Sequence, residues 1–524
     1  MTAIRTFIAT VQSMRGLWGF LIAVTFGALG VLGQAPFHFW PVFALSISGL
    51  LILLDGAATR PKPILSGFGI AWSWAFGYFL AGMFWVGNAF LVDAEKFALL
   101  MPFAVTALPA LLAMCWGFGG ALVLAFWRSD ASRVVVFAVA LSLAEFARGH
   151  ILTGLPWNLP AYIWQPGNII SQTSALIGPY GLSLLTLFVL ASPAGIVLSQ
   201  NKAFGKTIGT CAVAVAIGAF AFGAIRLNGA GVVNPMAGSG PIISAGQAGF
   251  TQKEVWESAN SLRVTQSYLD LLDHPKARQA DVVVWPEGTF PFMLQEQPEV
   301  LAALDARLGD RTLALGSIRR TRSGQGDTYF NSLFVLDRSQ GSLALSAVYD
   351  KYHLVPFGEY LPFRSIFQAM GIASLVSYEG EMTPGPAPAT LNVRGAPVAD
   401  PRICYEIVFP HFNPAALNKA DWILNVSVDA WYGDLLGPDQ HYAKARARAI
   451  ETGMPVVRAA SGGWSAIIDR YGRPLDQHRA GAGYASARLP LNAQSTFYSR
   501  HGDMMFLFMA GILGVIIGLT RKKY

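Results

Sequence analysis

Charged residues are scarce in this chain, where Asp, Glu, Lys and Arg together make up 13% of the 524 residues. Ordinary soluble domains carry about 25%, whereas hydrophobic residues here reach 53% and gather in long runs. This imbalance excludes an ordinary soluble protein and indicates a membrane protein. The net charge of +7 does not indicate a nucleic-acid partner, because many basic residues lie in short gaps between apolar runs, where they direct membrane topology.

Cysteine is equally scarce, with three residues in the chain. Cys115 and Cys211 lie in long apolar runs, where a thiol usually behaves as a small hydrophobic group. Cys404 lies in the only large polar region, so no disulfide can form within that region and the cysteine count does not indicate the redox compartment. The eight histidines show no paired metal-ligand spacing and no Gly-rich phosphate loop is present, so we expect no metal and no other cofactor.

Apolar runs long enough to cross a hydrocarbon core of about 30 Å recur along the chain. They predict a polytopic α-helical membrane domain of about eight spans. The second and fifth runs are the weakest candidates, each close to the minimum of about 17 residues that a span needs. The runs lie near residues 16–33, 37–54, 64–92, 98–127, 134–151, 172–199, 207–225 and 504–520.

Basic residues occupy alternate gaps between these runs, which predicts the orientation of the chain. By the positive-inside rule both termini are cytoplasmic, and the polar region faces outward, into the periplasm of a bacterium. We therefore expect spans one to seven in 1–227, a periplasmic domain in 228–503, and span eight with a cytoplasmic tail in 504–524 of an inner-membrane protein. The basic residues are Arg5, Arg15, Arg60, Lys62, Arg128, Arg133, Lys202, Lys206, Arg521, Lys522 and Lys523.

In the polar region the hydrophobic pattern changes to short β-like runs separated by turn residues. The pattern predicts strands that alternate with helices. This alternation indicates a single large α/β domain with a sandwiched sheet. Helices are expected over 253–273, 300–308 and 440–452. Strands are expected within 241–247, 280–288, 312–320, 331–337, 344–355, 397–406, 421–431, 454–461 and 465–472.

Three side chains with complementary chemistry each follow one of these expected strands: Glu287, Lys351 and Cys404. Taken singly, each has an ordinary interpretation, as a turn acid, a solvated surface charge and a buried inert thiol. Taken together, a carboxylate can accept the thiol proton, an ammonium can stabilise an oxyanion, and a thiolate can attack a carbonyl. The set predicts acyl transfer through a covalent thioester.

The segments around these residues carry a family resemblance. WPEGTFP (285–291), DKYHLVPFGEY (350–360) and RICYEIVFP (402–410) resemble the Glu-Lys-Cys motifs of the nitrilase, or carbon-nitrogen hydrolase, superfamily. NVSVDAWYGD (425–434) and QHYAKARARAIETGMPVVRAA (440–460) are similar to the blocks that follow them. A nitrilase-like domain inserted before the last of eight spans resembles the apolipoprotein N-acyltransferase family, over essentially the whole chain. The resemblance implies an αββα sandwich.

The resemblance also implies roles for single residues. Glu287 would be the general base, Lys351 the oxyanion stabiliser and Cys404 the nucleophile. The chain departs from the family pattern at Val428, where Asn is common, and at RAASGG (458–463), which lacks the usual polar Thr-Asn-Asn run. Supporting roles are implied for Glu359, Tyr405 and Glu406, and substrate-binding roles are expected for Trp256, Phe357 and Phe363.

The reaction implied by the resemblance is ping-pong transfer. Cys404 would take an acyl chain from a phospholipid and pass it to the α-amine of the N-terminal diacylglyceryl-cysteine of a lipoprotein, the last step of lipoprotein maturation. Independently, acyl chains bury about 0.8 kcal/mol per methylene, so an enzyme must meet such substrates in the bilayer. The apolar segment 360–378 is expected to be a mobile arm that enters the outer leaflet, or else a core helix with loops.

Two other functions remain open from the sequence. A membrane-tethered amidase would use the same thioester chemistry and resolve it with water. A transporter with an inactive outer domain would be favoured by a charged pair inside a span, for which Glu145 and Arg148 are the nearest candidates.

Overall fold

The chain divides into two compact units. A computed structural model describes residues 2–324, 326–369, 381–414, 416, 419–479 and 481–520. The first unit comprises residues 1–87, 100–230 and 501–524, and the second comprises 88–99 and 231–500. Segment 88–99 begins inside the third predicted span (64–92) and groups with the second unit. In that unit the Asn88 side chain donates to the Tyr432 carbonyl over 2.8 Å.

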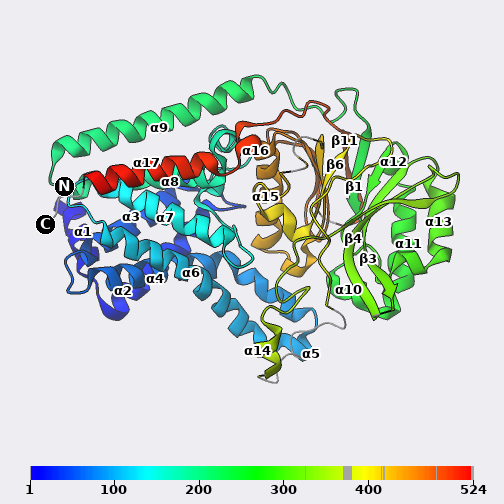
Figure 1. The fold of residues 1–524 in the computed structure, drawn as a ribbon, viewed down its shortest axis with the longest axis horizontal. Helices are drawn as coiled ribbons and strands as arrows, with labels where there is room; N and C mark the ends of the chain where they lie inside the picture. The colour runs from blue at the N-terminus through cyan, green and yellow to red at the C-terminus, as the bar shows by residue number, and fades with distance from the viewer. Residues whose placement is uncertain are drawn as a thin grey trace. The chain divides into compact units, whose positions relative to one another are not determined.

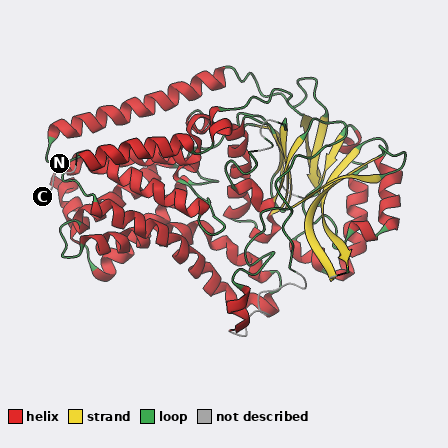
Figure 2. Cartoon of the chain, viewed as in Figure 1, coloured by secondary structure: helices red, strands yellow, loops and turns green. Residues whose placement is uncertain are grey.

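The first unit is helical (Figures 1 and 2). Helices suit apolar sequence in a bilayer because every backbone polar group is satisfied within the segment. Short 3₁₀ turns join several of them, including η1 (Val31–Gly33), η4 (Pro160–Ile163) and η5 (Ile170–Thr173). The α-helices are α1 (Thr2–Ser13), α2 (Gly16–Gly30), α3 (Trp40–Ala57), α4 (Pro63–Met83), α6 (Met101–Ala125), α7 (Arg133–His150), α8 (Ser174–Leu198), α9 (Lys202–Asn228) and α17 (Met504–Leu519).

Six helical stretches among the described residues are long and apolar enough to cross a membrane. The other two predicted spans correspond to α7 and α17. Helix α7 carries Arg133, Glu145 and Arg148 within its 18 residues, and α17 has 16 residues, which explains why the two are weaker candidates. The six are Gly16–Gly33, Trp40–Ala57, Pro63–Leu91, Ala94–Ala125, Ile170–Leu198 and Lys202–Asn228.

An irregular segment after α7 is buried inside the helical unit, where its backbone needs internal partners. Arg148 supplies two of them by donating to the carbonyls of Leu155 and Trp157. Gln34 donates to the Leu159 carbonyl over 3.1 Å. Arg148 also pairs with Glu145, and both side chains are fully buried. The pair therefore holds a loop in place, which is a structural use of a buried ion pair.

The second unit holds two sheets packed face to face. The six-stranded sheet has the order β11-β1-β2-β3-β4-β5, and the five-stranded sheet has the order β10-β9-β8-β7-β6. Pairing is parallel for β1-β2, β2-β3, β6-β7 and β7-β8 and antiparallel elsewhere. The strands are β1 (Ile242–Gln247), β2 (Val282–Val284), β3 (Thr312–Ser323), β4 (Gly326–Asp337), β5 (Ala344–Asp350), β6 (Ala399–Ile403), β7 (Trp422–Val428), β8 (Val456–Ser461), β9 (Ser465–Ile468), β10 (Pro474–His478) and β11 (Gly483–Arg488).

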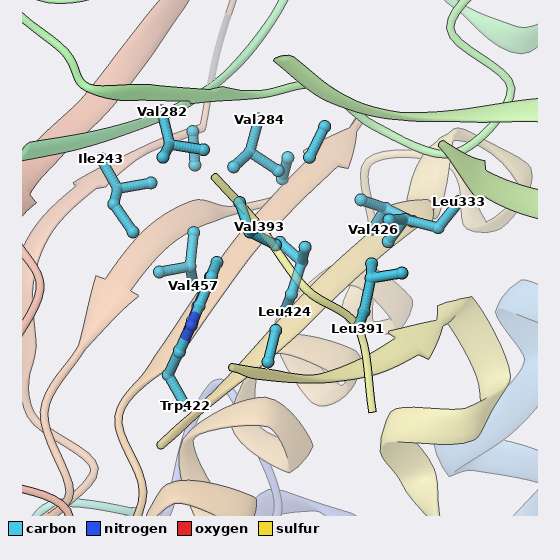
Figure 3. Packing of buried hydrophobic residues seen from close by; sticks show 14 of the residues in the cluster. Ile243, Val282, Val284, Leu333, Leu391, Val393, Trp422, Leu424, Val426 and Val457 are labelled. Carbon is cyan, nitrogen blue, oxygen red and sulfur yellow. The ribbon is translucent and has the colours of Figure 1, made fainter. Parts of the chain in front are cut away.

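The main core lies between the sheets, where Val284 of one sheet and Leu424 of the other belong to the same buried cluster (Figure 3). Alternate residues of β2 face opposite ways, as a strand requires, so Val283 packs under the outer helices α11 (Ser261–Leu271) and α13 (Pro298–Leu308). Helix α15 (Leu436–Thr452) packs against β8 of the other sheet. The layers are thus helix, sheet, sheet and helix, which confirms the expected αββα sandwich (Figure 1).

The sequence located most of these elements. Each expected strand segment contains a strand, whereas β10, β11 and the N-terminal helix α1 were not expected. The helix expected over 253–273 is interrupted, and becomes α10 (Gln252–Trp256) and α11. Of the expected arm, helix α14 (Arg364–Ala369) is present, and residues 370–378 lie outside the described residues. The remaining short helices are α5 (Ala94–Phe97), α12 (Pro275–Arg278) and α16 (Phe497–His501).

Candidate active site

The three residues singled out from the sequence follow three different strands. Glu287 lies beyond β2 after Pro286, Lys351 directly follows β5, and Cys404 directly follows β6. Gly316 on β3 lets the Glu287 backbone approach, because a Cβ there would lie 2.3 Å from Glu287 Cα. Ligand sites in α/β folds commonly form beyond strand ends, and this arrangement gathers polar side chains there.

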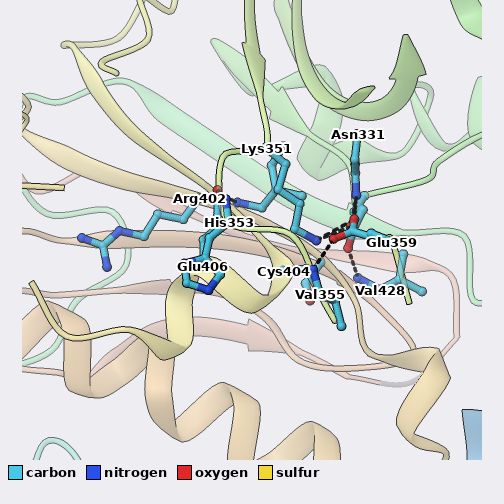
Figure 4. A network of polar contacts seen from close by, with 12 residues as sticks. Asn331, Lys351, His353, Val355, Glu359, Arg402, Cys404, Glu406 and Val428 are labelled. Atoms are coloured by element: carbon cyan, nitrogen blue, oxygen red, sulfur yellow. Dashed lines mark hydrogen bonds and ion pairs between the residues drawn. The ribbon is translucent and has the colours of Figure 1, made fainter. Parts of the chain in front are cut away.

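Two carboxylates of the site, Glu287 and Glu359, share one amide donor, and Figure 4 shows that donor, Asn331, beside Glu359. Asn331 Nδ2 donates to Glu287 Oε1 over 2.6 Å and to Glu359 Oε1 over 2.7 Å. The other oxygen of each carboxylate is also held, since the Val428 N–H donates to Glu287 over 3.0 Å and the Val355 N–H donates to Glu359 over 2.7 Å. Both carboxylates are therefore fixed in orientation.

Lys351 joins the two carboxylates. Its Nζ lies 2.9 Å from Glu359 Oε1 and 3.5 Å from Glu287 Oε1, and its side chain is 1% exposed. Burial by itself would lower the pKa of the Lys351 ammonium, but the nearby carboxylates of Glu359 and Glu287 raise it above its usual value. Lys351 therefore stays a cation inside the site.

Cys404 is buried, at 6% exposure, and has a left-handed backbone with φ of 48°. Burial raises the pKa of the Cys404 thiol to about 12, and the negative charge of Glu287 adds to this effect while Lys351 opposes it. The resting side chain is a neutral thiol, so it needs a base to become a nucleophile. Glu287 is the carboxylate whose charge acts most strongly on it.

Glu406 links the loops that carry Lys351 and Cys404. Its Oε1 accepts from the N–H groups of Tyr352 and His353 and from the Tyr349 hydroxyl, at 2.8, 3.0 and 2.9 Å. Its Oε2 accepts from the Ile403 N–H over 2.8 Å. Burial raises the pKa of Glu406 to about 7, and the hydrogen bonds oppose this rise.

The remaining predicted residues lie further out. Tyr405 is 8% exposed and packs edge-on against Phe409. Trp256, Phe357 and Phe363 are 49%, 55% and 64% exposed, and Phe357 and Phe363 have left-handed backbones. The Trp256 ring lies 6.3 Å from that of Trp431. The structure thus brings the polar residues together and leaves the three aromatic residues at the surface.

Two contacts of the carboxylates could not be read from the motifs. Asn331 begins the predicted strand NSLFVLD, and only its polarity at a strand end could have pointed to it. Val428 uses its backbone N–H on Glu287, so replacing the Asn common at this position leaves that contact unaffected. In the other departure from the family pattern, RAASGG (458–463), the Arg458 side chain pairs with the buried Asp429 carboxylate over 2.6 Å.

Two family models match parts of this chain. Residues 247–495 match the carbon-nitrogen hydrolase family, and residues 26–192 match the apolipoprotein N-acyltransferase N-terminal domain. Among solved structures, an amidase from Nesterenkonia sp. aligns with 53% of this chain and 98% of its own, at 16% identity and a TM-score of 0.35.

Full-length relatives are more similar. The apolipoprotein N-acyltransferase of Caulobacter vibrioides is 38% identical over 510 residues, covering 95% of this chain and 94% of its own. That of Rhodopseudomonas palustris is 35% identical over 523 residues, covering 97% and 96%. With identity at this level over nearly the whole length, the chain belongs to the apolipoprotein N-acyltransferase family.

Proposed function

We propose that this protein transfers an acyl chain from a phospholipid to the α-amine of the N-terminal diacylglyceryl-cysteine of a lipoprotein, through a thioester on Cys404. The observation that carries the proposal is the buried cluster in which Lys351 lies 3.5 Å from Glu287 and both charges act on the Cys404 thiol. Membership of an acyltransferase family supports the transfer reaction.

In the first half-reaction the Cys404 sulfur attacks the ester carbonyl of the phospholipid while Glu287 takes the thiol proton. The oxyanion that forms is stabilised by the Lys351 ammonium, which Glu359 holds. When this intermediate collapses, the ester C–O bond breaks and Glu287 returns the proton to the departing lysophospholipid. An acyl thioester remains on Cys404.

In the second half-reaction the free amine of the diacylglyceryl-cysteine attacks the thioester carbonyl. Glu287 accepts a proton from the amine and passes it to the departing Cys404 sulfur, so the thiol is regenerated. The products are an amide and the starting enzyme. Water must be kept from the thioester during this exchange, and the low exposure of Cys404 and Lys351 supports such exclusion.

The location of the substrates supports a membrane enzyme. Phospholipids and lipid-anchored proteins stay in the bilayer because burying each methylene contributes about 0.8 kcal/mol. We place the protein in the bacterial inner membrane with the second unit in the periplasm and both termini in the cytoplasm, on the distribution of Lys and Arg between the apolar runs. The exposed rings of Trp256, Phe357 and Phe363 are proposed to contact lipid substrates.

Intact mass spectrometry tests the proposal. The purified protein is incubated with a phospholipid, alongside a Cys404→Ser variant. We expect the wild type to gain the mass of one acyl chain, and a diacylglyceryl peptide with a free amine to remove that mass with formation of an amide. A folded protein that releases free fatty acid without amide product would instead identify a membrane-tethered amidase.

A further inference from the structure

Three buried polar residues lie behind the nucleophile and take no part in the steps above. Asp429 begins the 3₁₀ turn η10 (Asp429–Tyr432), His441 lies on α15 and Arg458 lies on β8. Each is 0% exposed. Burying polar side chains is costly unless they are hydrogen-bonded, so the contacts of this set indicate what it does.

His441 connects the set to the nucleophile. Its Nε2 lies 3.2 Å from the backbone carbonyl oxygen of Cys404, and its Nδ1 lies 2.8 Å from Asp429 Oδ1. A carbonyl oxygen can only accept a hydrogen bond, so Nε2 carries the hydrogen in this contact. The Asp429 carboxylate also only accepts, so both contacts are hydrogen bonds when both ring nitrogens carry hydrogens. Burial lowers the pKa of His441 and the Asp429 charge opposes this effect, and Arg458 Nη2 lies 3.2 Å from Nδ1. The ring lies between the carboxylate and the peptide that joins Cys404 to Tyr405.

Asp429 is itself held firmly. Arg458 Nη2 donates to both of its oxygens, over 2.8 and 2.6 Å, and the Ser427 hydroxyl donates over 2.8 Å. The positive charge of Arg458 holds the pKa of Asp429 well below its usual range, although burial acts in the other direction. The carboxylate is thus a fixed acceptor that sets the plane of the His441 ring.

The Cys404 backbone needs such support. A residue other than glycine in the left-handed region costs of the order of 1–3 kcal/mol and persists only when its surroundings hold it there. The peptide after Cys404 is planar and trans, so fixing its oxygen fixes the orientation of the whole peptide. The Cys404 Cα belongs to this plane, so holding the oxygen also restrains the atom that carries the nucleophilic side chain.

We propose that His441 is a positioning residue for acyl transfer, which holds the Cys404 carbonyl and so keeps the nucleophile in its left-handed conformation, with Asp429 and Arg458 fixing the imidazole. This inference deepens the proposed function and rests on Cys404 being the nucleophile. It assigns a purpose to His441 that helix packing alone would not require.

Two amide variants of His441 test the contacts of its two ring nitrogens separately. His441→Gln places an amide N–H near the Nε2 position, where it can still reach the Cys404 carbonyl. His441→Asn places its amide near the Nδ1 position, where it can reach Asp429 and Arg458 but not the Cys404 carbonyl. Both keep a polar side chain at the same buried site. His478→Gln and His478→Asn are matched controls on β10, where His478 contacts the Gly481 carbonyl.

The rate of single-turnover acylation by phospholipid is measured for all four variants, with the dependence on lipid concentration and the melting temperature. We expect His441→Asn to acylate about 10²-fold more slowly, the size of effect that a displaced reacting group gives, with half-saturation by lipid unchanged. His441→Gln should stay within about tenfold of the wild type, and the His478 variants should match it.

Alkylation of Cys404 by iodoacetamide provides a second readout that needs no lipid. It should fall in His441→Asn and recover in His441→Gln. Equal acylation and alkylation rates in the two His441 variants, with melting temperatures equal to that of the wild type, would overturn the positioning role. Failure of the wild type to form any thioester would instead overturn the proposed function, and the alkylation rates would still test the role of His441.

Discussion

Lys351 and Glu359 form the shortest ionic contact of the Glu287–Lys351–Cys404 cluster, with Nζ 2.9 Å from Oε1. The two residues are eight positions apart, and the intervening loop turns back so that the Val355 N–H also binds Glu359. The cation is thus held by a carboxylate other than the proposed base. Glu287 remains available to exchange a proton because its own contact with Lys351 is longer, at 3.5 Å.

Glu359→Gln should lower the acylation rate by about 10²-fold, since a neutral amide would no longer hold the Lys351 ammonium in place. The melting temperature should change much less than the rate. Single-turnover acylation followed by mass spectrometry measures the effect. Glu296→Gln, which alters a surface pair with Arg320, is the matched control, and an acylation rate for Glu359→Gln equal to that of the control would contradict this role.

Glu287→Gln should have opposite effects on the ionisation of the Cys404 thiol and on the rate of acyl transfer. The negative charge of Glu287 raises the pKa of Cys404, so removing it should lower that pKa and increase the rate of alkylation by iodoacetamide near pH 9. Acylation by phospholipid should nevertheless fall by about 10²- to 10⁴-fold, because the general base is lost. Both rates are measured on the same preparation. A parallel fall of both would show that Glu287 acts only through the structure of the site.

Glu406→Gln should change how stability depends on pH. Burial raises the pKa of Glu406 from 4.5 to about 7, so between these values the folded protein keeps a proton that the unfolded chain has lost. The stability gained from this group is complete below about pH 4.5 and is lost as the pH rises through about 7.

The variant cannot titrate at this position. The melting temperature of the wild type minus that of Glu406→Gln should therefore decrease from pH 5 to pH 8, by an amount equivalent to at most about 3 kcal/mol. Thermal unfolding in detergent over this pH series measures the difference. A difference that grows with pH would mean that the four hydrogen bonds to Glu406 outweigh its burial.

Gly316→Ala should displace the backbone of Glu287 and so impair the active site. The added Cβ would lie 2.3 Å from Glu287 Cα and 3.0 Å from the Gly288 nitrogen, so β3 or the Glu287 turn must move. We expect a loss of stability of about 1–3 kcal/mol and a fall in acylation of about 10²-fold. Gly324→Ala, where the added Cβ meets no atom within 4 Å, is the control. Acylation and melting temperature like those of the control would refute the close approach.

Arg148→Leu should destabilise the helical unit by about 3–5 kcal/mol, because it leaves Glu145 buried without its cation. The double variant Glu145→Leu with Arg148→Leu should recover part of this loss, although the carbonyls of Leu155 and Trp157 would still lack their donor. Melting temperature and the yield of monodisperse protein in detergent measure both. Lys206→Leu at an exposed position of α9 is the control, and a single variant as stable as this control would exclude a structural role for the pair.

Local sequence patterns predict much of the architecture. Hydrophobic run length predicted the membrane helices, and alternation of short apolar runs with turn residues predicted nine of the strands. The strands β10 and β11 were missed because PLDQH and GYASAR carry little apolar alternation. They are strands because β10 pairs with β9 and β11 pairs with β1, which is a tertiary reason.

Local sequence specifies which chemical groups this protein has, because Glu287, Lys351 and Cys404 lie in distinctive motifs beside strands that local pattern predicts. The partners that these groups meet depend on the folded chain. Asn331 reaches Glu287 across 44 residues of sequence, and His441 reaches the Cys404 carbonyl across 37. Such contacts depend on strand order and register, and these are set by packing between distant segments, which no local pattern encodes.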